Sequence, residues 1–462
     1  MRYLKRIAFS LFIISCWLTP SGLAMAQTAT DSLWRAGVAR VVITPTESMW
    51  MSGYAVRDHE SEGKLHDLWA KALALEDSRG NKAVMVSTDL LGFPKALSDR
   101  IRDRVANKYG LNKAQIMLNS SHTHCSPVLE DALMDVYPMN AAQLKKVSRY
   151  TDKVEDQIVD LIGSALRAMK PASVYTGNGV TRFQVNRRNN PAATLVSQTE
   201  IAGPSDYAVP VIKIVNPSGK LEAVAFGYAC HNTVLSNYQW SGDYAGFAQL
   251  ELEKLHPGVT AMFFQGAGAD QNPLPRGTIP LAQQYGRELA AAVDRVLQED
   301  MLRIAPALST AYREVELSLS TLPQKEDYAR MANEFKGYQQ RWAQRMLQSA
   351  ERGESFPQSY PFPLQVWKLG HQNIFALGGE TVVGYAIALK RIFGQDSFVF
   401  GYSNDVMAYI PTTTILREGG YEGHSSQMVY GLPTTWSADI ESVILHEMVK
   451  LAHEAGVKNH EQ

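Results

Sequence analysis

Short, continuous runs of apolar residues recur through the first half of the chain. Four of them occupy residues 69–76, 83–87, 116–119 and 223–229. Runs of this length are typical of strands that are buried on both faces of a sheet. We therefore expect these four segments to be strands buried on both faces.

Helical periodicity fills the spaces between these strands. The apolar residues of segment 97–105 recur every four positions, and Gly110 offers a C-terminal stop. Further stripes lie within residues 154–165 and 289–297, the latter preceded by Pro280 at a plausible first-turn position. Strands that alternate with helices predict the α/β class.

The second half of the chain has a different pattern. Residues 309–320 alternate in polarity like a half-exposed strand, and the polar segment 325–351 predicts one long helix. Segments 365–369 and 374–377 flank Gly370, which indicates a hairpin. Antiparallel strands beside buried ones favour a mixed-sheet α/β domain over a doubly wound parallel sheet.

The N-terminus has the features of a secretory signal peptide. It begins with three basic residues, continues with the apolar stretch 7–18, and reaches a small-x-small cleavage site at 24–26. Lipidation at Cys16 is an alternative. We expect a signal peptide at 1–26 and one catalytic domain at 27–462, in the periplasm or secreted, with no transmembrane anchor in the mature form.

Charge and cysteine content exclude some classes of function. Loss of residues 1–26 removes Arg2, Lys5 and Arg6 and no acid, so the net charge moves from −1 to −4. Without a basic tract, nucleic acid is not an expected partner. Cys125 and Cys230 remain, as either one disulfide or two buried thiols.

Candidate residues for catalysis or metal binding come directly after two of the buried strands. Residues 119–127 contain His122 and His124, and His231 follows the strand at 223–229. Strand ends are where α/β proteins place their sites, and histidine pairs can bind metal or simply stabilise turns. Asp243, a little further on, is either a residue that orients a ligand or a helix cap.

Three further segments carry glycine beside polar residues. Residues 263–273 form a strand followed by a glycine-rich loop that includes Asp270, without the phosphate-binding Gly-x-x-x-x-Gly-Lys pattern. No Gly-x-Ser-x-Gly elbow occurs in the chain, which argues against an α/β-hydrolase. Glu380 follows two glycines, and Tyr409 lies within 401–411. Taken alone, neither residue is distinguishable from a cap acid or a core aromatic.

Together, these five segments resemble the neutral/alkaline ceramidase family, in the same order along the chain. The resemblance covers roughly residues 35–435 and also includes the early segments Val42-Ile43-Thr44-Pro45, Met51-Ser52-Gly53-Tyr54-Ala55 and His66-Asp67-Leu68-Trp69. It implies the layered mixed-sheet fold of that family's catalytic domain.

The resemblance also implies a Zn²⁺ site. The family holds zinc with two histidines, a glutamate and a tyrosine, which match His122, His231, Glu380 and Tyr409. An earlier tyrosine of the family's Asn-x-Tyr-x-x-Tyr motif is Val406 here, at a position that is not a ligand. Further matches are His124, Arg187 and Tyr421, which the resemblance places near the substrate.

One departure bears on the chemistry. Family members that cleave ceramide carry a serine nucleophile where this chain has Asn272, in Asp270-Gln271-Asn272-Pro273. A carboxamide cannot be activated as a nucleophile in the way a hydroxyl can. The family's additional C-terminal domain is also not expected, since the sequence ends at Gln462. Both points weaken the expectation of ceramide as substrate.

We therefore predict a zinc-dependent hydrolase of an amide bond in a small-molecule or lipid-like substrate. Zinc can lower the pKa of bound water to about 7, which makes a nucleophile available without serine. His124 and Tyr421 are the expected oxyanion donors, and Asp270 acts in proton transfer or indirectly through Asn272. Arg187 is expected to bind a polar or anionic substrate group.

Three alternatives remain open from sequence. One is a zinc hydrolase of a polar or carbohydrate-derived amide or ester, whereas the ceramidase-like case predicts a deep apolar slot for acyl chains. Another is a binding protein on a hydrolase fold. In the third, all these residues are structural. The long polar segment 325–351 is placed to reshape the pocket entrance in any of these cases.

Overall fold

The computed structural model describes residues 33–460, and the elements named below are those of this range. The predicted signal peptide, its cleavage site and Cys16 lie outside the described residues. Residues from Leu33 onward form one compact unit. Within the described range, no helix has the length and apolar character needed to span a bilayer.

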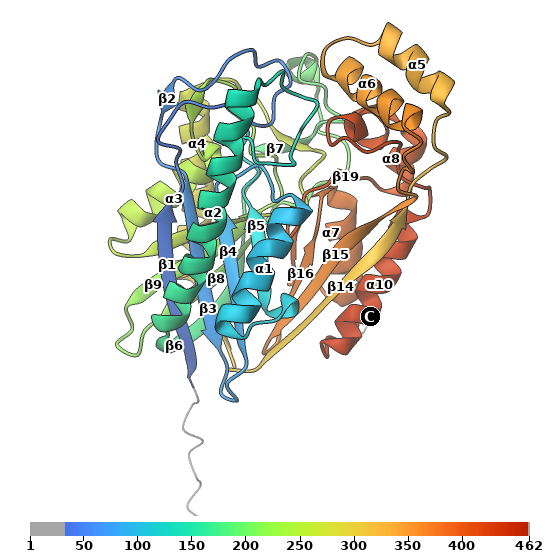
Figure 1. Cartoon of the computed structure of the whole chain (residues 1–462). Coiled ribbons are helices and arrows are strands. Elements are labelled where there is room, and N and C mark those ends of the chain that lie inside the picture. Colours follow the sequence, from blue (N-terminus) through green and yellow to red (C-terminus); the bar gives the residue numbers. More distant parts are fainter. Residues whose placement is uncertain (1–32, 461–462) are drawn as a thin grey trace, which may run out of the picture. The chain divides into compact units, whose positions relative to one another are not determined.

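A mixed nine-stranded sheet forms the centre of the first half of the chain (Figure 1). Its strand order is β11-β9-β8-β6-β1-β3-β4-β5, with β13 on β6. The pairs β4/β5 and β9/β11 are parallel, and the other pairs are antiparallel. Its strands are β1 (Trp34–Val42), β3 (Trp69–Glu76), β4 (Lys82–Thr88), β5 (Ile116–Ser120), β6 (Lys170–Val180), β8 (Ala208–Val215), β9 (Leu221–Tyr228), β11 (Thr260–Gln265) and β13 (Leu302–Ile304).

A second sheet of four strands comes from the second half of the chain. Its order is β14-β15-β16-β18, formed by β14 (Leu308–Ser318), β15 (Ser359–Leu369), β16 (Gln372–Leu377) and β18 (Phe398–Phe400). Three two-stranded ladders complete the strands: β2 (Gly63–Lys64) with β10 (Gln239–Trp240), β7 (Gln184–Asn186) with β12 (Gln271–Pro273), and β17 (Glu380–Thr381) with β19 (Tyr409–Ile410).

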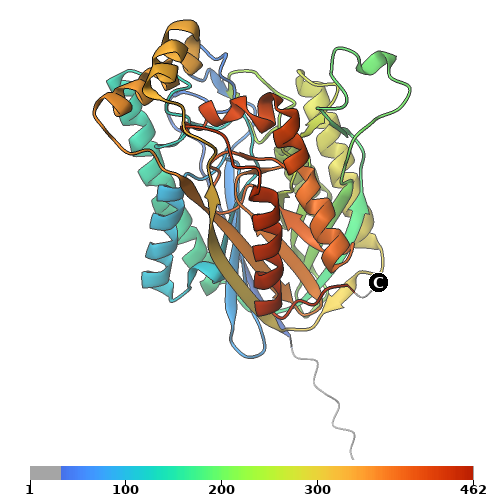
Figure 2. The same cartoon turned by 90° about the vertical axis from the view of Figure 1, so that its right-hand side faces the viewer.

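Helices α1 to α4, α7 and α10 cover the outer faces of the two sheets. The helices of the described range are α1 (Lys95–Tyr109), α2 (Ala141–Arg167), α3 (Asp243–Leu255), α4 (Ile279–Gln298), α5 (Lys325–Glu334), α6 (Gly337–Glu351), α7 (Val383–Phe393), α8 (Thr413–Glu418), α9 (Gly420–Gly423) and α10 (Ile440–Glu454), with 3₁₀ turns η1 (Lys113–Gln115), η2 (Leu195–Ser197) and η3 (Ser425–Met428). Helices α1 to α4 share a core with the first sheet, and α7 and α10 share one with the second. Figure 2 shows α7 and α10 in front of the second sheet.

The two sheets share a third core between them. Leu73, Met85 and Phe264 of the first sheet pack there with Trp367 and Phe400 of the second. Because side chains alternate along a strand, the neighbours of these residues face the helices instead. This arrangement explains why the four apolar runs lack alternation, since both faces of their strands are buried. The predicted strands buried on both faces and the mixed-sheet α/β class are confirmed.

Two local predictions have clear outcomes. The hairpin at Gly370 is confirmed, since β15 and β16 pair antiparallel around it. The single helix over 325–351 is wrong. Two helices form instead, interrupted at Phe335 and Lys336, and Gly337 adopts a φ of 62° that a continuous helix does not contain. The break lets α5 and α6 fold against each other.

The α5–α6 hairpin has a small core of its own, made of Tyr328, Ala332, Trp342, Ala343, Met346 and Met428. It docks on the segment after η3, where the Trp342 indole donates to the Leu432 carbonyl (2.9 Å). Arg345 and Asp135 form a bidentate ion pair with contacts of 2.6–3.0 Å. The polar helices therefore hold two loops, at 135 and at 428–432, at the end of the molecule where β7 and α8 lie (Figure 1).

Candidate metal centre and active site

His122 leaves β5 in a left-handed conformation, with φ at 58°. Its Nδ1 lies 2.6 Å from the Leu91 carbonyl oxygen, which can only accept a proton. The bond therefore fixes the proton on Nδ1 and leaves the lone pair of Nε2 directed into the interior. A backbone acceptor of this kind is the usual way that proteins orient a metal-binding histidine.

His231 and Glu380 meet this nitrogen from two other segments. His231 follows β9, and Glu380 opens β17 directly after β16 of the second sheet. Glu380 Oε2 lies 3.2 Å from His122 Nε2 and 3.3 Å from His231 Nε2. Burial, followed by the nearby His122, lowers the pKa of His231 well below its usual value, so its imidazole is neutral at physiological pH.

These atoms fit a divalent cation. Glu380 Oε1 accepts a hydrogen bond from the Tyr430 hydroxyl (2.5 Å), whereas the buried Oε2 has no hydrogen-bond partner in the described chain. An unpaired carboxylate oxygen and two imidazole nitrogens thus converge on one point. Zinc prefers this combination of donors, and a buried charge without a partner is otherwise expensive.

Tyr409 reaches the same place through strand pairing. It lies opposite Glu380 in the parallel β17/β19 ladder, and its ring stacks nearly parallel to that of His231, at 9° and 6.3 Å between centroids. Burial and the Glu380 carboxylate raise the pKa of Tyr409 well above its usual value. His122, His231 and Glu380, from segments far apart in sequence, therefore converge on one point, and Tyr409 packs beside His231.

His124 belongs to the same cluster of nitrogens. Its Nε2 is 3.1 Å from His122 Nε2, and the ligand nitrogens of His122, His124 and His231 all lie within 4.8 Å of one another. Burial, followed by His122, lowers the pKa of His124 well below its usual value. Gly53 is required beside it, because its φ is 101° and a Cβ there would lie 2.4 Å from the His124 ring.

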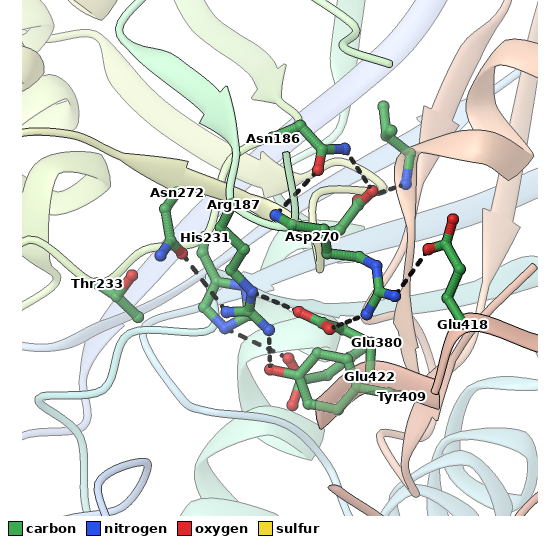
Figure 3. A network of polar contacts seen from close by, with 12 residues as sticks. Asn186, Arg187, His231, Thr233, Asp270, Asn272, Glu380, Tyr409, Glu418 and Glu422 are labelled. Atoms are coloured by element: carbon green, nitrogen blue, oxygen red, sulfur yellow. Dashed lines mark hydrogen bonds and ion pairs between the residues drawn. The ribbon is translucent and has the colours of Figure 1, made fainter. Parts of the chain in front are cut away.

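Arg187 connects the metal centre to a polar network (Figure 3). Its guanidinium donates to Glu422 Oε1 (2.6 Å), to the Tyr409 hydroxyl (3.2 Å) and, more weakly, to Asn272 Oδ1 (3.5 Å). Glu422 already neutralises this guanidinium, so binding of a polar or anionic substrate group by Arg187 stays a prediction. Sequence pattern could not show this pairing, since the partner lies 235 positions away.

Asp270 anchors the loop that carries Arg187. Its Oδ2 accepts from the Asn186 side chain (2.9 Å) and its Oδ1 from the Val383 backbone N–H (2.9 Å), while its carbonyl accepts from the Arg187 N–H (2.8 Å). Figure 3 shows Asp270 between Asn186 and the start of α7. With both oxygens bonded and the residue fully buried, the geometry fits the indirect role and not proton transfer.

Asn272 and Tyr421 lie at the open side of the centre. They line a pocket of about 590 Å³ together with Arg187, Arg188, Asn189, Ala192, Glu418 and Glu422. Tyr421 is 42% exposed, and its ring is 5.2 Å from that of Tyr409. The pocket wall is charged and polar, so the apolar slot expected from a ceramidase-like substrate is not found at this position.

Other predicted residues have structural roles. Cys125 and Cys230 are buried free thiols, so no disulfide joins them. Asp243 accepts from the Leu235 and Tyr244 N–H groups, which holds the loop between His231 and α3. Two residues that the sequence prediction missed are Tyr430 and Tyr402, whose hydroxyl lies 3.5 Å from His231 Nδ1. Tyr430 lies outside the five segments and Tyr402 within the last of them, and only the tertiary fold brings both residues to the metal centre.

Known proteins resemble this chain over much of its length. A family model described as neutral/alkaline non-lysosomal ceramidase, N-terminal, matches residues 34–273. Neutral ceramidase A of Dictyostelium discoideum is 28% identical over 270 residues, which are 54% of this chain and 37% of that protein. Neutral ceramidase 2 of Arabidopsis thaliana is 25% identical over 50% of this chain and 31% of its own length. The matched region thus spans well under half of these relatives.

Solved structures extend the likeness beyond the matched sequence. One described as a ceramidase complexed with C2 superposes with a TM-score of 0.73 at 18% identity, covering 94% of this chain and 77% of that one. Neutral ceramidase from Pseudomonas aeruginosa gives 0.72 at 20% identity, with 94% and 76% covered. At this identity the likeness establishes the shared fold. Glu380 and Tyr409 lie beyond the sequence match, so their placement rests on the geometry described above.

Proposed function

Because this chain belongs to the neutral/alkaline non-lysosomal ceramidase family, we propose that it is a zinc-dependent hydrolase that cleaves an N-acyl amide bond with water. The observation that carries the proposal is Glu380 Oε2, an unpaired buried oxygen 3.2–3.3 Å from two imidazole nitrogens. We assign His122, His231, Glu380 and Tyr409 as the residues that hold the metal. A zinc ion bound there would supply an acidified water and polarise the substrate carbonyl.

The chain's own residues orient the substrate and handle its protons. His124 is neutral, so its imidazole can either donate to the carbonyl oxygen or accept a proton from the attacking water. Tyr421, half-exposed at the rim of the polar pocket, is the second expected donor. Arg187 acts on Tyr409, holding its hydroxyl through a hydrogen bond of 3.2 Å. Loss of one oxyanion donor typically lowers turnover about 10²- to 10³-fold.

The polar pocket supports a second candidate substrate class. Its wall at Arg187, Glu418 and Glu422 is charged, and Asn272 offers both a donor and an acceptor. A polar or carbohydrate-derived amide or ester would satisfy these groups better than an alkyl chain would. In either case Asn272 cannot form an acyl-enzyme, so water is the direct nucleophile.

The N-terminal pattern supports export of the protein to the periplasm or the medium. Zinc sites and free buried thiols are compatible with that location, because both thiols are shielded from oxidants.

Metal content and a substrate panel test the proposal. Protein purified without chelators should carry about one zinc per chain by mass spectrometry, and His231→Ala should lose it. The panel should pair long-chain N-acyl amides with short-chain and N-acetyl sugar amides, with release of acid followed by liquid chromatography. His256→Ala is a matched control, since His256 pairs with Asp294 on the surface and should retain metal. Wild-type protein that takes up no zinc on incubation would refute the proposal.

A further inference from the structure

A second cavity is lined by Leu91 and Tyr430, two residues that also contact the metal centre. Its volume is about 240 Å³. It shares two residues with the metal site: the Leu91 carbonyl accepts from His122, and the Tyr430 hydroxyl donates to Glu380. Neither His122 nor Glu380 itself lines it. The cavity is therefore a separate compartment that touches the same supporting residues.

About half of the cavity wall is apolar. Leu91, Leu129, Leu133, Val406, Met407 and Leu432 contribute to it. Exposed Ala96 and Asp131 also line it, which places an opening to solvent on that side. In another protein an engineered cavity of roughly 150 Å³ holds benzene, so this one has room for about ten non-hydrogen atoms.

One carboxyl group in this wall lacks a partner. Asp405 is 3% exposed, and its Oδ2 accepts from the Tyr360 hydroxyl (2.7 Å). Its Oδ1 has no hydrogen-bond partner in the described chain. A buried carboxyl oxygen without a donor is costly, and a ligand that brings an N–H group would remove that cost.

The charges around the cavity favour a cation over an anion. Lys95 lines it too, but its ammonium is bound by Glu314 (3.0 Å) and Asp99 (3.2 Å), so it is already neutralised. Asp131 adds a carboxylate at the mouth. An ammonium group therefore meets two acids, whereas a carboxylate would meet them as like charges.

We propose that this cavity is a binding site for a compact aliphatic amine, with the alkyl part against the leucines and the ammonium on Asp405. The site is distinct from the polar pocket at Arg187 and goes beyond the hydrolase function. Val406 lines the cavity, so a larger side chain at this position would fill part of it.

Calorimetric titration with hexylamine tests this inference, with hexanol and hexanoate as probes of equal chain length. We expect hexylamine to bind at least tenfold more tightly than hexanoate. Asp405→Asn should abolish that preference, and Tyr360→Phe, which keeps the carboxyl group, should preserve it. Val406→Tyr should remove binding of all three probes by filling the cavity.

Equal affinity for hexylamine and hexanoate would overturn the inference, and so would wild-type binding by Val406→Tyr. Circular dichroism confirms that each variant is folded, and Val406→Tyr keeps the test decisive if Asp405→Asn does not fold. The titration measures binding and does not depend on catalytic turnover. A protein that hydrolyses no amide can still bind hexylamine, so failure of one proposal leaves the other standing.

Discussion

Tyr430→Phe is the most direct test of how the metal site is supported. The substitution removes one oxygen, which donates to Glu380 Oε1 at 2.5 Å, and leaves the ring in place. Glu380 is only 3% exposed, so the substitution removes the donor to a buried carboxylate oxygen. A hydrogen bond to a buried charged group contributes about 1.5–3 kcal/mol, which corresponds to roughly 10- to 150-fold in an equilibrium constant.

We expect the loss of this hydrogen-bond energy to weaken zinc binding by a similar factor. Removing groups that orient metal ligands typically weakens binding about 10- to 100-fold, in the same range. Competition against a fluorescent chelator of known affinity measures the change on purified protein. Without its donor, the carboxylate can rotate away from the point where it meets His122 and His231.

Tyr402→Phe is the matched control. Its hydroxyl lies 3.5 Å from His231 Nδ1, a distance at which a hydrogen bond is weak. It should therefore change zinc affinity by less than the Tyr430 substitution. Unchanged affinity in Tyr430→Phe, or a larger loss in Tyr402→Phe, would refute the assignment of Glu380 as a ligand oriented by Tyr430.

Three further substitutions have defined outcomes. Gly53→Ala should lower turnover by at least tenfold with zinc retained, because its Cβ would collide with the His124 ring; equal kcat in the variant would contradict this. Asp135→Asn weakens the bidentate pair with Arg345, so limited proteolysis should cut residues 325–351 faster than in wild type. Burial raises the pKa of Asp405 to about 7, so the folded state binds more protons than the unfolded state between pH 4 and 7, and stability falls as pH rises through this window. In Asp405→Asn, the free energy of unfolding from urea titrations should depend less on pH across this window. The same pH dependence in both proteins would exclude Asp405 as the group responsible.

The sequence was informative where chemistry follows directly from a strand. The apolar runs at 116–119 and 223–229 are buried on both faces, and the histidines come directly after them. Their position at strand ends therefore follows from hydrophobic pattern alone. Glu380 and Tyr409 needed the family resemblance, because an acid after two glycines and a buried tyrosine have common structural explanations.

Long-range partners were beyond sequence reasoning for a physical reason. A motif reports residues that are close in the chain, whereas Arg187 is neutralised by Glu422 and Glu380 is bound by Tyr430, 50 positions away. The break at Gly337 was missed because both helices are amphipathic with compatible polarity, and only packing against Met428 and Trp342 favours the folded hairpin. The cost of a positive φ there is small for glycine.

The replacement of serine by Asn272 has a consequence for the path of the reaction. A serine nucleophile needs a base in contact with its hydroxyl, yet the polar group nearest to Asn272 Oδ1 in the network is the Arg187 guanidinium, a donor that cannot accept a proton. Asp270 is committed to Asn186 and Val383, so it supplies no base either. Restoring a hydroxyl by Asn272→Ser would therefore give a serine without a base. The surroundings of this position, and not the single side chain, favour direct attack by water, with His124 as the titratable group placed to exchange its proton.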